Sequence, residues 1–299
     1  MLSIIFIGCI GMVFSQQIPQ YSQYMFNRML INPGATGSDE DLPIQIAVRQ
    51  QWAGFEDAPS TQILSGHYRF SQYNMGVGAT LFLDRFGHER KLGLQLNYAY
   101  MIDVFYDTKL AFGLSLQLFQ YQLDYTNLVA LDQTDEVIYN STQSKFVPET
   151  DFGIYLYNDY YFAGLSANQM IGMPVKIAGE EIQMSKLVQH YNLMGGYRFD
   201  LQNDFEIEPS LLLKSSFKAP TELDINVRGI YQENYWLGFS YRTAGDIITM
   251  LGLKYDPIDF GLAIDFATSE IARYQNGSYE LFVKYTLPIN QGPKGRSLF

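Results

Sequence analysis

Large apolar residues alternate with small or polar residues along positions 109–122. The large apolar positions are Leu110, Phe112, Leu114, Leu116 and Leu118, and the positions between them are Ala111, Gly113, Ser115 and Gln117. A period of two is typical of a β-strand whose two faces meet different environments. The run exceeds the about 5–6 residues of an ordinary soluble strand and suits the roughly 9–11 residues that cross a bilayer at a tilt. It therefore predicts an all-β fold, a transmembrane antiparallel β-barrel with lipid outside and a polar lumen.

Further segments of the same period, separated by turn residues, predict about fourteen strands. The predicted strands are 44–52, 61–70, 75–84, 92–102, 108–122, 151–157, 161–168, 190–199, 205–214, 222–231, 235–242, 248–255, 258–266 and 278–287. An even number is expected for a bacterial outer-membrane barrel.

The predicted connections alternate in length. The longer ones follow odd-numbered strands, and the longest are residues 123–150 and 169–189. Outer-membrane barrels have short periplasmic turns and long extracellular loops. The alternation predicts that both termini are periplasmic and that strand 108–122 extends beyond the membrane to support the loop at 123–150.

Charged residues fall on the strand face opposite the large apolar residues. A charge facing lipid at the bilayer midplane costs about 2–4 kcal/mol, so these residues are expected in the lumen. The predicted lumen charges are Glu206, Glu208, Asp224, Arg228, Lys254, Asp265, Glu280 and Lys284. Two interpretations stay open: a pathway for a solute, and an internal salt-bridge network that fills the barrel.

The chain divides into four predicted parts. Residues 1–15 resemble a secretory signal peptide, residues 44–287 form the barrel, and residues 288–299 form a C-terminal tail. Residues 16–43 are too polar and too interrupted to form a spanning strand. This N-terminal segment is expected to plug the lumen, to line the periplasmic mouth, or to stay extended for a partner.

Composition agrees with a barrel and excludes other classes. Charged residues make up only 17% of the 299 residues, against about 25% in soluble domains, while aromatic residues reach 15%. The mean hydropathy of −0.08, with no long apolar run after the N-terminus, argues against a helical membrane protein. A net charge of −11 argues against nucleic acid as a partner. The single cysteine, Cys9, lies in the predicted leader, so no disulfide is expected.

No catalytic or cofactor-binding arrangement stands out. The three histidines, His67, His88 and His190, lack the spacing of metal ligands. Ser65 and His67 share one face of a predicted strand and are the only candidate pair for a lipid-modifying barrel enzyme. We expect them to be ordinary polar residues of the barrel, and we predict no enzymatic activity, cofactor or metal.

Three sequence blocks resemble the PorP/SprF family of outer-membrane proteins from the type IX secretion system of Bacteroidetes. They are residues 16–33, residues 49–62 with R-Q-Q-W-A-G-F and A-P-S-T-Q, and residues 76–87. The motif residues, which are also candidates for contacting partners, are Gln20, Tyr21, Gln23, Tyr24, Phe26, Asn27, Asn32, Pro33, Gln51, Trp52, Gly54, Pro59, Thr61 and Gln62.

The resemblance implies a non-enzymatic protein of the outer membrane. It implies support for the export or surface anchoring of secreted cargo bearing a C-terminal targeting domain, for example gliding adhesins. The implied partners are this cargo, the periplasmic ring and peptidoglycan-binding components of the secretion system, and outer-membrane lipid. The alternative is a plugged outer-membrane channel for the uptake of small solutes.

Overall fold

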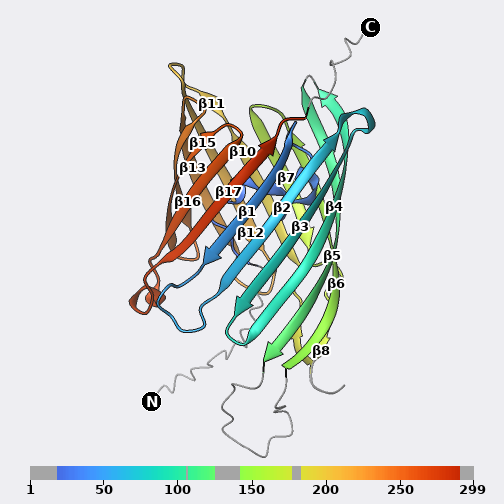
Figure 1. Cartoon of the computed structure of the whole chain (residues 1–299), viewed down its shortest axis with the longest axis vertical. Helices are drawn as coiled ribbons and strands as arrows, with labels where there is room; N and C mark the ends of the chain where they lie inside the picture. The colour runs from blue at the N-terminus through green and yellow to red at the C-terminus, as the bar shows by residue number, and fades with distance from the viewer. Residues whose placement is uncertain (1–18, 106, 125–141, 177–182, 290–299) are drawn as a thin grey trace, which may run out of the picture.

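The computed structural model describes residues 19–105, 107–124, 142–176 and 183–289. Fourteen antiparallel strands form a closed barrel (Figure 1). The strands of the first half are β1 (Leu42–Gln50), β2 (Ser60–Phe70), β3 (Met75–Phe86), β4 (Glu89–Phe105), β5 (Thr108–Asp124), β6 (Thr142–Tyr157) and β7 (Tyr161–Asn168). Those of the second half are β10 (His190–Tyr197), β12 (Phe205–Ser215), β13 (Glu222–Tyr231), β14 (Tyr235–Arg242), β15 (Asp246–Tyr255), β16 (Ile258–Ala267) and β17 (Ser278–Leu287). No helix among the described residues is long and apolar enough to cross a membrane.

Two pairings complete the wall of the barrel. The last strand pairs with the first, from Leu42 opposite Leu287 to Gln50 opposite Tyr279, which closes the barrel. β10 pairs with β12, and the two-residue strand β11 (Phe199–Asp200) extends that pairing. A separate hairpin of β8 (Pro174–Lys176) and β9 (Gln183–Lys186) lies outside the barrel sheet.

All fourteen predicted strands are present, but the prediction for β6 was wrong at its start. β6 begins at Thr142 instead of 151, so much of the predicted loop at 123–150 is strand, and residues 125–141 lie outside the described residues. Pro148 and the charged Lys145 and Glu149 obscured the period there. The predicted loop at 169–189 was also incomplete, because it contains β8 and β9.

The predicted alternation between faces is confirmed. Along the middle of β5 the large apolar side chains point outward, with Leu114 50% exposed, while Ala111 and Ser115 are buried on the lumen side. β13 shows the same order, with Ile225 outward and Asp224 buried inward.

The alternation reverses beyond Leu118. Phe119, Tyr121 and Leu123 are buried on the inner face, where they pack with Val147 of β6 and with Leu187. Their neighbours on the outer face are polar glutamines. Polar outside and apolar inside is the arrangement of a sheet in water. The reversal agrees with the prediction that β5 continues beyond the membrane. We call residues 119–124 of β5 and residues 142–149 of β6 the outer arm.

The two ends of the barrel differ in their connections. We call the end with the tight turns 71–74, 158–160 and 232–234 the short-turn end, and the opposite end the long-loop end (Figure 1). The loops at 51–59 and 268–277 lie at the long-loop end, but the connections 87–88 and 243–245 there are as short as the turns at the other end. Leu42 and Leu287 lie together at the short-turn end.

The lipid-facing interpretation of β5 can be tested with two arginine substitutions. We expect Leu114→Arg to reduce the free energy of unfolding by about 2–4 kcal/mol, because it places a charge at the bilayer midplane. Gln120→Arg, on the same face beyond the reversal, should cost less than about 1 kcal/mol. Urea-dependent folding into phospholipid vesicles measures both. Equal losses would place position 120 inside the bilayer.

Candidate functional site in the lumen

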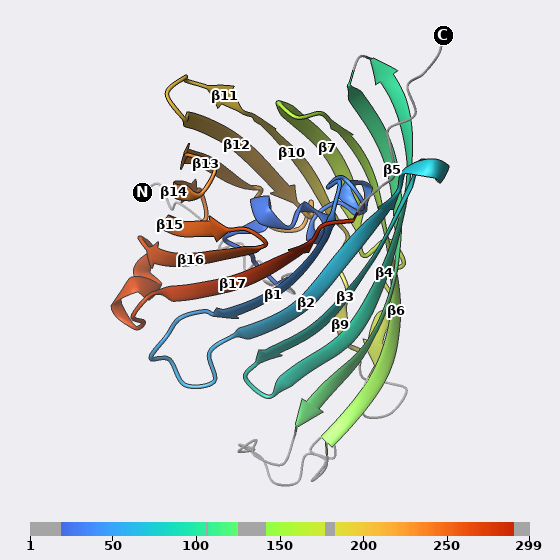
Figure 2. The ribbon, with the colours of Figure 1, turned by 45° about the horizontal axis from the view of Figure 1, so that its top comes forward.

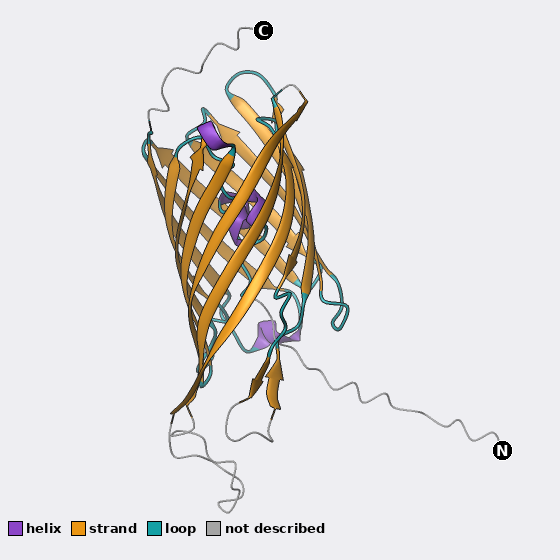
Figure 3. Cartoon of the chain, turned by 90° about the vertical axis from the view of Figure 1, so that its right-hand side faces the viewer, coloured by secondary structure: helices purple, strands orange, loops and turns teal. Residues whose placement is uncertain are grey.

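Residues 19–41, which we call the lumen segment, lie inside the barrel (Figures 2 and 3). Three short 3-10 helices shape it, at Tyr24–Phe26, Arg28–Leu30 and Pro33–Ala35. The side chains of Tyr24 and Met29 are 1% and 2% exposed, and Asn32 is fully buried. Of the three arrangements expected for the N-terminal segment, the described residues adopt the one inside the lumen.

The lumen segment crosses the barrel from end to end. Pro19 lies near Lys91 and Leu187 at the long-loop end, whereas Asp41 accepts a hydrogen bond from the backbone N–H of Ile289 at the short-turn end, at 3.1 Å. That the segment starts on the periplasmic side stays a prediction, but its first described residue lies at the end of the barrel opposite to Leu42 and Leu287. The sequence could not reveal this direction, because the direction depends on wall residues far away in the chain.

A buried ion cluster holds the start of the lumen segment. Arg49 of β1 lies 2.6 Å from Asp265 of β16 and 3.2 Å from Glu280 of β17. Glu280 accepts the backbone N–H groups of Ser22 and Gln23 at 2.8 and 2.9 Å. The Ser22 hydroxyl donates to Asp265 and accepts from Arg49. Three strands and the segment thus share one network in which each charge has a partner.

A second cluster surrounds the fully buried Arg242 of β14. Its guanidinium contacts both carboxylate oxygens of Asp224, at 3.0 and 3.3 Å. It also donates to the Gln20 side chain at 3.4 Å, and Gln20 in turn donates to Glu222 at 3.2 Å. This cluster fixes Gln20 against β13 and β14.

Aromatic packing holds the middle of the lumen segment. The Phe26 ring lies 4.5 Å from Trp236 and 4.8 Å from Phe282, and the Arg228 guanidinium lies 4.7 Å above its centre. Asn226 donates a hydrogen bond to the Tyr24 hydroxyl at 2.5 Å.

Glu208 of β12 joins the lumen segment to two further arginines. It accepts from Arg228 at 2.8 Å, from Arg28 of the segment at 3.3 Å and from Arg198 at 3.5 Å. The Arg28 guanidinium also lies 3.8 Å above the Phe162 ring. Arg28 therefore combines an ion pair with a cation–π contact.

A groove of wall glycines receives the Asn32-Pro33-Gly34 motif. The Asn32 side chain donates to the carbonyls of Ile154 and Leu165 at 3.0 and 3.1 Å and accepts from the Gly34 N–H at 2.8 Å. A Cβ atom on Gly113 of β5 would collide with the backbone of residues 33 and 34, and one on Gly153 of β6 would collide with Asn32. These strand positions must be glycine because another backbone passes so close to them.

Ser65 and His67, the candidate enzymatic pair, both contact the lumen segment. Ser65 accepts a hydrogen bond from the Asn27 side chain at 2.6 Å. His67 Nδ1 accepts from the Gly37 N–H at 3.0 Å, and Nε2 lies 3.4 Å from Asp39. The hydrogen bond from His67 holds the pKa of the Asp39 carboxyl below its usual range. Holding the segment accounts for the positions of both side chains.

The second motif block lies in the loop between β1 and β2. Ala53 in this loop exchanges backbone hydrogen bonds with the 268–277 loop, through Gly277 and Asn276 at 2.8 and 2.7 Å. Trp52 packs edge-on against Phe86, with 6.4 Å between ring centres. Of the remaining positions of this block, Gln51 and Pro59 join the two ends of the loop by a backbone hydrogen bond, and Gly54 lies against Asn276. The Thr61 hydroxyl donates to Asp84, and Gln62 points outward from β2.

Most predicted lumen charges face inward and are paired, which favours the salt-bridge interpretation. Besides the clusters above, Lys284 pairs with Asp259 at 2.7 Å, and Glu206 lies 3.7 Å from Arg198. Lys254 is an exception, since it is exposed near the short-turn end. The period of single strands did not single out Arg49 and Arg242. Pairing the first strand with the last would have placed Arg49 opposite Glu280.

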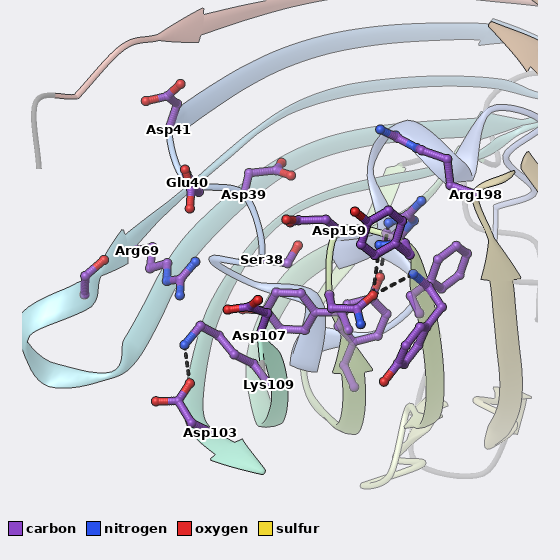
Figure 4. A pocket seen from close by; sticks show the side chains of 18 of the residues that line it. Ser38, Asp39, Glu40, Asp41, Arg69, Asp103, Asp107, Lys109, Asp159 and Arg198 are labelled. Carbon is purple, nitrogen blue, oxygen red and sulfur yellow. Dashed lines mark hydrogen bonds and ion pairs between the residues drawn. The ribbon is translucent and has the colours of Figure 1, made fainter. Parts of the chain in front are cut away.

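A cavity of about 1460 Å³ opens beside the lumen segment at the short-turn end (Figure 4). Its lining includes Arg28 and residues 38–41 of the lumen segment, and the charged wall residues Asp103, Asp107, Lys109, Asp159 and Arg198. At the other end of the segment, Pro19 and Tyr21 line a space of only about 80 Å³. Among the described residues, no group of three or more His, Cys, Asp or Glu side chains is placed to share a metal ion.

Comparison with known proteins gives a family and a fold. The family described as Type IX secretion system membrane protein PorP/SprF matches residues 13–285. No curated protein matches the sequence. Among solved structures, the Ralstonia pickettii toluene transporter TbuX is 9% identical with a TM-score of 0.53, covering 86% of this chain and 92% of its own. The CymD monoaromatic hydrocarbon channel is 12% identical with a TM-score of 0.52, covering 88% and 93%. At these identities the likeness concerns the barrel fold alone.

The glycine groove predicts that a methyl group at position 113 will loosen the lumen segment. Gly113→Ala should raise the rate of tryptic cleavage after Arg28 about tenfold in the folded barrel, because overpacking of this kind costs about 1–3 kcal/mol. Gly195→Ala is the matched control, since its Cβ would meet only the Phe162 carbonyl oxygen, at 3.5 Å. Heat-dependent gel mobility verifies that each barrel is folded. Equal rates of tryptic cleavage after Arg28 in both variants would contradict the role of the glycine groove in holding the segment.

Proposed function

This chain belongs to the type IX secretion system membrane protein PorP/SprF family, and from that premise we propose that it supports export or surface anchoring of secreted proteins with a C-terminal targeting domain. The barrel fold and the family place it in the outer membrane. Its role in type IX secretion is that of a membrane component, in keeping with a family of secretion proteins rather than enzymes.

The observation that carries the proposal is the lumen segment. Residues 19–33 of the first family block supply side chains that fill the lumen, and wall charges and glycines from both halves of the barrel hold them. A barrel whose lumen is occupied by its own chain is suited to presenting surfaces at its two mouths. The long-loop end would receive cargo, and the cavity at the short-turn end would face the periplasmic ring and peptidoglycan-binding components.

A channel for small solutes is the competing proposal, and bilayer recordings separate the two. We expect the purified full-length barrel to show no sustained conductance, because contacts toward both ends of the lumen hold the segment. Steady conductance that depends on one solute would favour the channel. A pore-forming outer-membrane protein inserted under the same conditions serves as the positive control.

Removal of the protein from its cell should affect a particular secreted protein. We expect one or a few proteins with the C-terminal targeting domain to disappear from the cell surface, either retained in the cell or released into the medium. Mass spectrometry of surface, cell and medium fractions measures this, and restoring the gene should restore the lost protein. If every secreted protein still reaches the surface and stays there, the proposed function is wrong.

A further inference from the structure

β6 has an open edge on the outer arm. It pairs with β5 over its whole length, from Asp124 opposite Thr142 to Lys109 opposite Tyr157. On its other side it pairs with β7 only from Phe152 to Tyr157. The chain after β7 then covers the next few residues, since Met170 donates to the Thr150 carbonyl at 2.9 Å. Among the described residues, no strand pairs with this edge of β6 before position 149, although β8 begins beside it, where the N–H groups of Ile171 and Met173 donate to the Glu149 side chain.

The direction of the backbone groups at this edge follows from two observations. The Thr150 carbonyl points away from β5, because it accepts from Met170. Backbone groups alternate in direction with a period of two along an antiparallel strand, so Pro148, Phe146 and Ser144 also direct theirs away from β5. Pro148 agrees with this direction, because a proline there removes no hydrogen bond from the ladder with β5. Ser144 and Phe146 therefore each offer an N–H and a C=O at the open edge.

Side chains and position decide what fits this edge. Phe146 is 64% exposed on the outer face, next to the backbone groups that no described strand pairs with. The stretch lies on the outer arm, past the reversal at Leu118, and therefore in water at the long-loop end. An extended strand satisfies alternating N–H and C=O groups along an edge, and its own side chains can pack on an exposed aromatic ring.

We propose that the edge at Ser144–Phe146 binds an edge strand of the cargo's C-terminal targeting domain by strand addition. The inference rests on the proposed function, since it names the surface through which the barrel would hold its cargo. Pro148 ends the ladder on one side, so the bound strand would be short. Side-chain contacts around Phe146 would then select among strands, while the backbone ladder would supply the common geometry.

Paired substitutions separate backbone pairing from side-chain contact. The variant S144P/F146P removes both edge N–H groups but leaves the ladder with β5 intact, as native Pro148 does. The matched control S144A/F146A removes the side chains and keeps the N–H groups. We expect the proline variant to reduce the surface amount of the cargo lost on deletion by at least about tenfold. The alanine control should retain most of it.

The outcomes distinguish this inference from the proposed function. If deletion removes a cargo but the proline variant keeps it, the edge is not the docking surface, and the proposed function stands. If both variants lose the cargo equally, recognition rests on side chains and strand addition is wrong. If the proline variant retains the cargo but abolishes a dimer that the wild-type barrel forms, the edge binds a second copy of the barrel and the proposal is overturned.

A second measurement does not depend on folding of the proline variant. Amide hydrogen exchange at Ser144 and Phe146 is followed in the wild-type barrel in detergent, with and without the purified targeting domain of the lost cargo. Exchange at both amides should slow by at least about tenfold on addition of the domain, because each N–H gains an acceptor. Unchanged exchange at a domain concentration that saturates binding would overturn the proposal.

Discussion

The buried pairing of Arg49 with Asp265 and Glu280 is the interaction on which much of the rest depends. It joins the first strand to the last two and, through Ser22 and Gln23, attaches the lumen segment to the seam where the barrel closes. Charges withdrawn from water are tolerated only when each is paired, and loss of one partner from such a pair costs about 3–5 kcal/mol. Closure of the barrel and occupation of its lumen are therefore coupled through the same side chains.

The wall and the lumen segment also match in shape. Ions hold the first part of the segment, where Gln20 and Ser22 meet arginines and carboxylates. Farther along, glycines on β5 and β6 bring the wall backbone close to the backbone of residues 32–34. A charged network tolerates small shifts of side chains, but two backbones in contact do not. The glycine groove therefore fixes the position of the segment, while the ion clusters satisfy the polar groups that the filled lumen buries.

A filled lumen changes where recognition can take place. The segment occupies the space that a transport pathway would need, so the accessible surfaces are the cavity at the short-turn end and the loops and outer arm at the other. The outer arm has an apolar inner cluster around Phe119 and Val147, which gives β5 and β6 support in water beyond the bilayer. With this support the chain from Thr142 onward forms a strand instead of part of the predicted loop.

The sequence by itself determined the barrel, about fourteen strands, the lipid and lumen faces of several of them and the family, because alternation and motif spacing are local properties. It misplaced the start of β6, where Pro148 and Lys145 interrupt the period, and it did not show that Ser65 and His67 contact the lumen segment. Only the tertiary structure decided the direction of the lumen segment, the partners of Arg49 and Arg242 and the open edge of β6. Each of these depends on which distant strands closure of the barrel brings together, and no periodicity within a single strand carries that information.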